Sequence, residues 1–357
     1  MTPVRYGVVG AGWRAGFFLR CAEVLAGQVE LTGVVARRPE AAEALRRAGR
    51  PVLATLDELL ATRPEFVVLS VPRAENPRLI AELVARGVPV LAETPPAADA
   101  DALRALWAQV GAARRVQVAE QYLLMPGHAA RLALVRSGVV GTPTSVQVSS
   151  THGYHAVSMI RGLLGGVSGP ATVTARTFRA PLRQPLTRAG WTGDTEPVPA
   201  TTTLATIDLG GVSGLYDFTD NQWHNPLRTR RIVVRGTDGE LVGDTVTRLA
   251  GPRTVLTSEL VRRQLGIDLD LDGYDTEHVS FEGSVLWRNP FLGHRLADED
   301  VAVATLVSRT AAWVRDEGPE PYPLAEACED QLLALAVEEA AGTGRDVRTG
   351  REAWSPS

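Results

Sequence analysis

Short apolar runs alternate with amphipathic stretches over the first third of the chain. The runs predict β-strands at 4–9, 29–36, 66–71, 88–93 and 116–119, and the stretches between them predict helices at 39–47, 79–86 and 100–110. The run 66–71 lies between Pro64 and Pro72 and is almost entirely apolar, which is typical of a strand buried on both faces of a parallel sheet. Strands that alternate with helices imply right-handed crossovers. We therefore predict an α/β domain with a doubly wound parallel sheet, ending near Gln121.

The pattern changes after a predicted helix at 125–137. Strands follow at 145–151, 171–178, 202–208, 212–219, 231–234 and 253–257, with few helices between them, and helices at 298–316 and 324–341 close the chain. The segment 183–199 is rich in Pro, Gly, Arg and Thr and predicts a long loop. This half of the chain predicts an α+β domain with an open, largely antiparallel sheet. The predicted domains are therefore residues 1–121 and 122–357.

The first strand is followed by the glycine-containing turn Gly10-Ala11-Gly12-Trp13-Arg14-Ala15, and then by a helix through Leu19. Gly10 allows a tight turn, Gly12 lets a pyrophosphate approach the backbone, and Ala15 lets the helix lie close to the strand. Free N–H groups and the positive end of the helix dipole favour phosphate oxygens. The strand, turn and helix together predict a Rossmann domain that binds a dinucleotide, with Trp13 and Arg14 beside it.

Composition narrows the classes of partner. The chain has 357 residues, 45% of them hydrophobic, and a net charge of −4, which argues against nucleic acid as a partner. No apolar stretch is long enough for a membrane span, and no signal peptide is expected before the first strand. The two cysteines, Cys21 and Cys328, are too few for a disulfide framework, which suits the cytoplasm. All 37 basic residues are arginine, so no step of a reaction can use a lysine amine.

Four local patterns, in order, resemble the glucose-fructose oxidoreductase / inositol dehydrogenase (Gfo/Idh/MocA) family. They are the Gly10 turn, Glu93-Thr94-Pro95 where the family writes Glu-Lys-Pro, the stretch His152–Arg161 where it has a His-x-x-Asp helix, and the closing Gly344-Arg345-Asp346-Val347. The resemblance implies an NAD(P)-linked oxidoreductase of sugars, cyclitols or their derivatives. It places the nicotinamide over the strand ends and the substrate between it and the second domain's sheet. It also implies a homodimer or homotetramer formed through the open sheet.

The chain departs from the family at two positions that orient substrate and move its hydroxyl proton. Thr94 stands at the lysine position and Ser158 at the aspartate position. A threonine hydroxyl is far too weakly acidic to exchange its proton at neutral pH, and a positioned acid or base is worth about 10²- to 10⁴-fold in rate. Either another residue has taken over, the reaction has changed, or catalysis has been lost.

The best replacement is His155, at the family's histidine position, because an unperturbed imidazole titrates near ~6.5 and works in both directions. His152 lies one helical turn earlier if the helix has already begun there, and Tyr154 adds a phenol for substrate binding. The alternative for these residues is a helix-capping cluster around one buried histidine. Tyr122 is a further candidate proton donor, although interdomain packing explains it equally well.

Cofactor preference depends on the end of the second strand. The acidic residue that would bind the ribose of NAD is absent, because Ala36 stands there and Arg37 and Arg38 follow. A guanidinium binds a 2′-phosphate in bidentate fashion, so we expect NADP in preference to NAD, unless the two arginines are simply solvated. The resemblance adds further cofactor-binding positions, with Pro95 in the cis form. They are Ser70, Pro72, Glu93, Thr94 and Pro95.

Substrate contacts are predicted at Gln121, Trp223 and His224, and no metal site is predicted. Three functions remain open at this point. The first is an NAD(P)-dependent oxidoreductase of a sugar-like small molecule, with His155 in place of the usual acid-base pair. The second is an imine (C=N) reductase, since an iminium already carries its proton. The third is a nucleotide-binding protein that has lost turnover and serves as a sensor or partner subunit.

Overall fold

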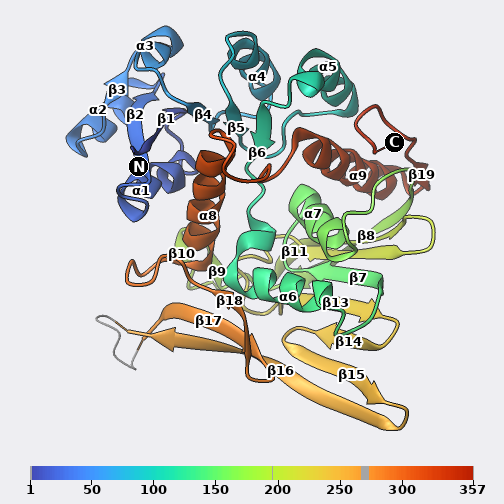
Figure 1. Cartoon of the computed structure of the whole chain (residues 1–357). Helices are drawn as coiled ribbons and strands as arrows, with labels where there is room; N and C mark the ends of the chain where they lie inside the picture. Colours follow the sequence, from blue (N-terminus) through green and yellow to red (C-terminus); the bar gives the residue numbers. More distant parts are fainter. Residues whose placement is uncertain (1, 195, 267–272, 357) are drawn as a thin grey trace. The chain divides into compact units, whose positions relative to one another are not determined.

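The computed structural model describes residues 2–194, 196–266 and 273–356. The chain forms two compact units (Figure 1). The first comprises the chain up to Pro126 together with Gln264–Glu277 and Asn289–Cys328, and the second comprises the remainder. The chain first passes from the first unit to the second between Pro126 and Gly127, five residues after the boundary expected at Gln121. A later segment returns to the first unit, which the pattern of strands and helices did not predict.

The first unit is built on a parallel sheet of six strands in the order β3-β2-β1-β4-β5-β6. The strands are β1 Val4–Val9, β2 Val29–Val35, β3 Val52–Leu53, β4 Phe66–Leu69, β5 Val90–Ala92 and β6 Val116–Val118. The helices are α1 Ala15–Val24, α2 Pro39–Arg47, α3 Leu56–Ala61, α4 Asn76–Ala85 and α5 Ala100–Val110. All four residues of β4 are buried, as expected for a central strand. The predicted doubly wound sheet is confirmed.

Two elements of this unit were not predicted, β3 and α3. The start of α3 nevertheless has a clear local cause. The Thr55 hydroxyl accepts a hydrogen bond from the Glu58 N–H at 3.1 Å, and the Glu58 carboxylate accepts one from the Ala54 N–H at 2.8 Å. This arrangement is close to a capping box, which stabilises the first turn of a short helix.

Helix α8, Asp298–Trp313, belongs to the first unit and lies beside α1 (Figure 1). Its inner face is apolar and buried, and its first turn is acidic. Arg20 of α1 forms an ion pair with Asp300 at that acidic end. Because α8 is far from α1 in sequence, it brings its first turn to the glycine turn only through the tertiary fold.

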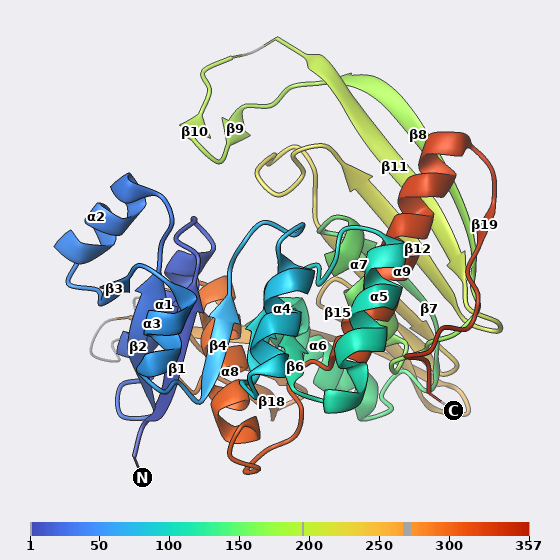
Figure 2. The same ribbon diagram turned by 90° about the horizontal axis from the view of Figure 1, so that it is seen from above.

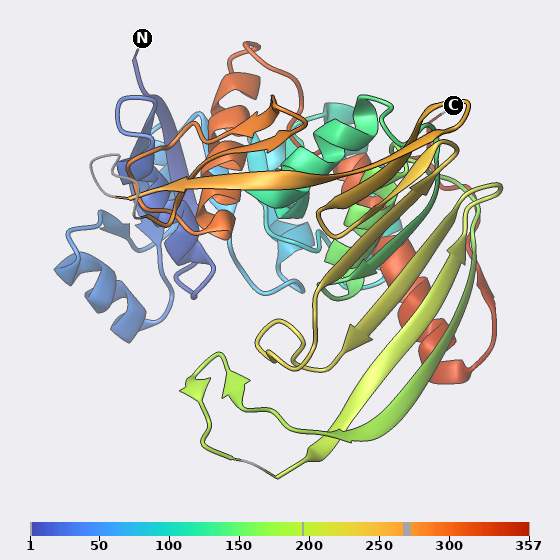
Figure 3. The same cartoon turned by 90° about the horizontal axis from the view of Figure 1, so that it is seen from below.

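The second unit is built on a sheet whose described strands follow the order β18-β17-β16-β15-β14-β13-β7-β12-β11-β8-β19. Neighbouring strands are antiparallel wherever their pairing is defined, except for β7 and β12, which are parallel. Figure 3 shows these strands side by side. The predicted strands correspond to β7 Pro143–Ser149, β8 Thr172–Leu182, β11 Val198–Asp208, β12 Ser213–Thr219, β13 Arg231–Gly236 and β16 Thr254–Leu265. The predicted fold class is confirmed.

Several strands of this sheet were missed, and one predicted loop is partly wrong. The missed strands are β14 Gly239–Val242, β15 Thr245–Gly251, β17 Asp275–Phe281, β18 Ser284–Arg288 and β19 Val347–Arg348. Instead of one long loop over 183–199, β8 continues to Leu182, β11 begins at Val198, and a small hairpin of β9 Leu186–Thr187 and β10 Gly190–Trp191 lies between them (Figure 2). These strands are short or lack a regular alternation of apolar and polar residues, so a pattern search does not find them.

Helices of the second unit are α6 Pro126–Arg136, α7 Gly153–Leu163 and most of α9 Leu324–Thr343. Helix α7 packs on β7 and β12, where Gly214 leaves room for the Ile160 side chain. A buried ion pair joins α7 to α9, since Arg161 Nη1 donates to Asp330 Oδ1 at 2.6 Å and both side chains are almost completely buried. The sheet and α7 together position the histidine pair described below.

Candidate active site

The glycine turn after β1 has a tight side and an open side. Gly10 has a φ of +123°, and a Cβ at this position would lie 2.0 Å from the Ser70 carbonyl oxygen at the end of β4. A Cβ on Gly12 would meet no described atom within 4 Å. Gly10 is therefore required by the protein's own backbone, whereas Gly12 leaves its outer surface open to a ligand.

The start of α1 is suited to an anion. Its N-cap residue, Arg14, makes no side-chain cap, and the first turn contains no acidic residue. Trp13 is exposed and packs edge-to-face on Phe17, with ring centroids 5.0 Å apart. Nothing in the turn repels a pyrophosphate, and the N–H groups at a helix start attract one. The residues present fit the dinucleotide that the turn predicts.

Arg37 and Arg38 follow β2 and are exposed. Among the described residues, neither guanidinium has an ion pair or side-chain hydrogen bond. The Ser70 N–H donates to the Val9 carbonyl at 2.8 Å, and Pro72 is exposed two residues further on. These residues lie at the carboxyl ends of β2 and β4, on the edge where doubly wound sheets bind nucleotides.

The end of β5 is held rigidly. Glu93 is buried, and the Thr94–Pro95 peptide bond is cis, as expected. The fully buried Asn76, from the start of α4, donates through Nδ2 to the Glu93 carbonyl at 2.9 Å and to the Pro95 carbonyl at 3.2 Å. The Thr94 N–H donates to Glu93 Oε2 at 3.2 Å. Asn76 thus holds the segment Glu93-Thr94-Pro95, in which Thr94 stands where the family pattern has lysine.

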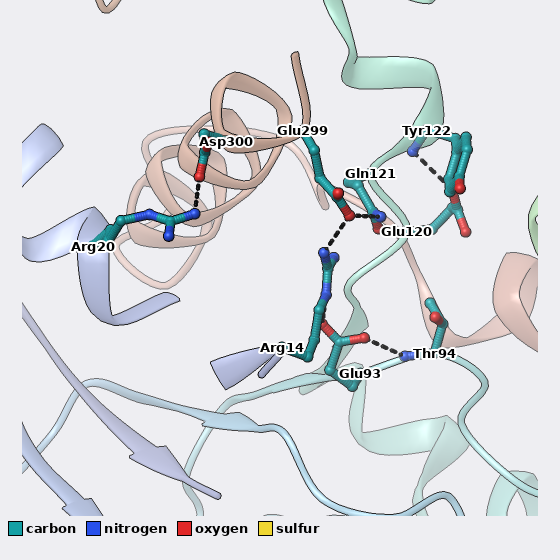
Figure 4. A network of polar contacts seen from close by, with 9 residues as sticks. All are labelled: Arg14, Arg20, Glu93, Thr94, Glu120, Gln121, Tyr122, Glu299 and Asp300. Carbon is teal, nitrogen blue, oxygen red and sulfur yellow. Dashed lines mark hydrogen bonds and ion pairs between the residues drawn. The ribbon is translucent and has the colours of Figure 1, made fainter. Parts of the chain in front are cut away.

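Arg14 lies between two carboxylates (Figure 4). Its Nε donates to Glu93 Oε1 at 2.6 Å, and its Nη1 donates to Glu299 Oε1 at 2.7 Å. Burial opposes the charge of the guanidinium, but Glu93, Glu299 and Glu120 together outweigh it and raise the pKa of Arg14. Arg14 therefore stays charged at any working pH and is the cation of a site that contains no lysine.

The segment after β6 contributes Glu120, Gln121 and Tyr122 to the same edge (Figure 4). Glu120 and Gln121 are buried and Tyr122 is half-buried. The Tyr122 N–H donates to Glu120 Oε1 at 2.9 Å, and Gln121 Nε2 donates to Glu299 Oε1 at 3.3 Å. The turn after β1 and the ends of β5 and β6 are therefore connected through α8.

In the second unit, the predicted protic residues form an aromatic cluster. The His152 ring lies 5.7 Å from that of His155 and 4.5 Å from that of Trp223, and the Tyr154 and His155 rings are 5.4 Å apart. Trp223 Nε1 donates to Thr151 Oγ1 at 3.4 Å. The cluster brings together two imidazoles and a phenol, as predicted, with one of the predicted substrate residues.

Helix α7 begins at Gly153, so His152 is its N-cap residue and not part of an earlier turn. Partial burial of the ring, followed by the neighbouring His155, lowers the pKa of His152 to about 4. His152 is therefore neutral at neutral pH and serves as a hydrogen-bonding group. Ser158 donates from Oγ to the His155 carbonyl at 2.9 Å, so its hydroxyl is directed to the helix backbone.

The amino-terminal residues 4–121 match the family model described as "Oxidoreductase family, NAD-binding Rossmann fold", the Gfo/Idh/MocA model. These residues resemble the nucleotide-binding domain of that family, and their expected NAD-binding Rossmann fold is confirmed. The match supports the expected class, an NAD(P)-dependent oxidoreductase. No curated protein sequence matches the chain significantly.

Solved structures share the fold of the chain over nearly its full length at low identity. An oxidoreductase from Agrobacterium radiobacter, solved with NAD⁺, L-tartaric acid and magnesium, has a TM-score of 0.69 and 17% identity, covering 97% of this chain and 98% of its own. A myo-inositol dehydrogenase from Corynebacterium glutamicum has a TM-score of 0.66 and 20% identity, with 100% of both chains covered. GenD2 from gentamicin A biosynthesis, solved with NAD, has a TM-score of 0.66 and 22% identity, covering 98% and 97%.

Other predicted features of the chain have a less direct bearing on the site. His224 follows Trp223, but no side-chain hydrogen bond or ring contact joins it to the cluster within the described residues. Cys21 and Cys328 are buried, and burial raises the pKa of Cys21 to about 12. In the described part of the chain, no helix is long and apolar enough to cross a membrane.

Sequence reasoning missed Glu299, Asn76 and Phe218. Glu299 is 285 positions from Arg14, and no local pattern marks the pair. Asn76 carried a weak signal, since a polar residue at the start of an apolar helix is often buried for a hydrogen bond. The Phe218 ring lies 5.9 Å from that of His152 and 4.6 Å from that of Trp223. In the sequence, Phe218 cannot be distinguished from an ordinary core residue of a strand.

Proposed function

We propose that the protein transfers a hydride between NAD(P) and a sugar, cyclitol or sugar-like substrate, with His155 as the acid-base residue. The main support is the glycine turn. The Ser70 carbonyl leaves no room for a side chain at Gly10, whereas Gly12 and the start of α1 are open to a pyrophosphate. The substrates of the structural neighbours, an inositol among them, support the substrate class. The nicotinamide, when bound, supplies the hydride acceptor or donor.

The chain's own residues would manage the proton. In alcohol oxidation, His155 would accept the hydroxyl proton as the hydride leaves the same carbon, and in carbonyl reduction it would return that proton. Thr94 cannot take this part, since its hydroxyl is too weakly acidic. His152, with its lowered pKa, would orient His155 or substrate, and Tyr154, Trp223 and His224 would contact substrate. Tyr122 is the alternative proton donor.

Reduction of a C=N bond is a second candidate, and the charge of the β5 and β6 ends favours it. Glu93, Glu120 and Glu299 surround a single guanidinium, that of Arg14, so carboxylates are in excess there. Such an excess suits a substrate that carries positive charge. An iminium needs no proton from the protein when it accepts hydride, which would also account for the loss of the lysine.

The first experiment separates the candidates. NADPH and NADH are titrated against the protein by cofactor fluorescence, and sugars, cyclitols, ketones and imines are then screened for turnover. We expect micromolar binding and turnover in the sugar or cyclitol class. Turnover of imines alone would support the second candidate, and binding without turnover would support a silent sensor or partner subunit. Absence of binding of either nucleotide at millimolar concentration would refute all three.

We also propose that NADP is preferred to NAD. The exposed Arg37 and Arg38 have no carboxylate partner among the described residues and can bind a 2′-phosphate. Replacing both by alanine is expected to weaken NADPH binding about 10- to 100-fold, because charge-assisted hydrogen bonds contribute about 1.5–3 kcal/mol. NADH binding in the same fluorescence titration should change little. Equal losses for both cofactors would contradict the preference.

We propose a homodimer or homotetramer that associates through the open sheet. Phe178 and Leu204 are exposed on β8 and β11, and the pairing of Phe178 with Thr202 puts both side chains on one face. An apolar surface of this kind commonly marks an interface. Light scattering that gave the mass of one chain, 38.2 kDa, would contradict this proposal. The two cysteines are too few for a disulfide framework, which supports a cytoplasmic location, and fractionation of the native cell would test it.

A further inference from the structure

Two buried polar atoms beside the glycine turn are left without a hydrogen-bond partner among the described residues. They are Nη2 of Arg14, a donor, and Oε1 of Gln121, an acceptor. A buried polar group without a partner costs about 1–3 kcal/mol, so native structures rarely leave one without a reason. Gln121 is only 3% exposed, which makes the case strongest there.

The two atoms lie around the same carboxylate. Arg14 Nη1 and Gln121 Nε2 both donate to Glu299 Oε1, at 2.7 and 3.3 Å (Figure 4). Because a carboxylate only accepts hydrogen bonds, it determines that the amide of Gln121 turns its NH₂ toward Glu299 and its oxygen away. In Arg14, Nε and Nη1 donate to Glu93 and Glu299, so Nη2 is the guanidinium nitrogen that is left without a partner within the residues that the structure describes.

The charge around these atoms favours a neutral ligand group. The guanidinium of Arg14 already serves Glu93 and Glu299, and Glu120 lies close enough to affect its pKa. A further anion would meet an excess of carboxylates. A neutral group that offers one acceptor to Arg14 and one donor to Gln121 satisfies both atoms, and a primary carboxamide has this pair of groups on one carbon.

The position of the pair is that of the second nucleotide. Gly10, Glu93 and Gln121 follow the carboxyl ends of β1, β5 and β6 in the sheet order β3-β2-β1-β4-β5-β6. A dinucleotide lies across this edge with one nucleotide on each half of the sheet. Since Arg37 and Arg38 occupy the β2 side, the nicotinamide belongs to the half formed by β4, β5 and β6.

We propose that Arg14 and Gln121 bind the carboxamide of the nicotinamide, with Arg14 donating to its oxygen and Gln121 accepting from its NH₂. The inference rests on the proposed binding of NAD(P) and assigns Gln121 to the cofactor instead of the substrate. Glu93 and Glu299 then act as positioning residues that hold the Arg14 fork in place. Recognition of the ring amide sets which face of the ring is presented, so these residues determine the geometry of hydride transfer.

The test uses three ligands and binding calorimetry, with no turnover involved. NADP has the full carboxamide, and its 3-acetylpyridine analogue keeps the carbonyl but has a methyl in place of NH₂. The third ligand, 2′-phospho-ADP-ribose, lacks the nicotinamide ring. We expect wild-type protein to bind the analogue about 3- to 10-fold more weakly than NADP, the effect of one hydrogen bond. Gln121→Met should weaken NADP binding by the same factor and leave the analogue unchanged.

The arginine is tested with Arg14→Lys, which keeps a cation for Glu93 and Glu299 but loses the planar fork. This variant should bind both NADP and the analogue about 10-fold more weakly, with unchanged affinity for 2′-phospho-ADP-ribose. Arg20→Gln is the matched control, because it removes the other ion pair between α1 and α8 and should change no affinity.

The outcomes separate this inference from the proposed function. Failure of wild-type protein to bind NADP or 2′-phospho-ADP-ribose would refute the proposed function and this inference with it. If wild-type protein binds NADP, two results would overturn the inference alone. The first is an equal loss of affinity for all three ligands in Arg14→Lys, and the second is unchanged NADP affinity in Gln121→Met. The second result would mean that a buried water, or a direct bond between Arg14 and Gln121, satisfies the two atoms.

Discussion

Replacing Gly10 by alanine is expected to destabilise the first unit and to abolish NADPH binding. The residue has a φ of +123°, which an L-residue rarely adopts, and the added Cβ would lie 2.0 Å from the Ser70 carbonyl oxygen. Strain of this kind costs about 1–3 kcal/mol, and relief of the overlap by moving β4 adds to it, so we expect a total of about 2–5 kcal/mol. Urea unfolding measures the stability loss, and fluorescence titration measures NADPH binding.

Gly12→Ala is the matched variant. Its Cβ would meet no described atom within 4 Å, so the free energy of unfolding should change by no more than about 0.5 kcal/mol. NADPH binding should nevertheless weaken about 10- to 100-fold, because the methyl group would occupy the surface that a pyrophosphate approaches. Unchanged NADPH affinity in Gly12→Ala would show that the nucleotide does not lie on the turn.

Replacing His155 by alanine is expected to lower turnover about 10²- to 10⁴-fold, the usual value of a positioned acid or base. NADPH affinity should not change, because His155 is assigned to the proton and not to cofactor binding. Steady-state kinetics on the best substrate of the screen, together with the fluorescence titration, provides the measurement.

His152→Ala is the control for this prediction. With a pKa lowered to about 4, His152 is neutral over the working pH range and has no proton to donate. Its removal should therefore lower turnover by less than about 10-fold. If His155→Ala retained full turnover, the acid-base assignment would be wrong, and Tyr122→Phe would be the next variant to measure.

The elements that were predicted correctly share a local cause. The strand at 66–69 is short, apolar and bounded by prolines, and the turn of Gly10 and Gly12 lies directly between a strand and a helix. The elements that were missed lack such a cause. Strand β15, Thr245–Gly251, has a single buried residue, Val246, and is held mainly by its pairing with β14 and β16. Pairing partners are a property of the whole sheet, and a single stretch of sequence does not contain them.

The candidate site divides in the same way. Gly10, Gly12, the Glu93-Thr94-Pro95 segment and the His152–His155 pair are close together in sequence, so their chemistry was recognisable from residue types and spacing. The pair of Arg14 with Glu299 was not, because their hydrogen bond closes a separation of 285 positions. The absence of lysine from the sequence showed that the lysine of the family's Glu-Lys-Pro pattern is missing, but it did not show which arginine lies beside Glu93.

Residue order alone was enough to predict the class of fold and the glycine turn, since each depends on neighbours within a few residues, and it also suggested the altered acid-base positions, which stay a prediction. The return of α8 to the first unit, the network around Arg14 and the neutral state of His152 depended on the folded chain. The physical reason is that burial and charge are set by all the groups around an atom. In this protein, the groups that matter most arrive from distant parts of the chain.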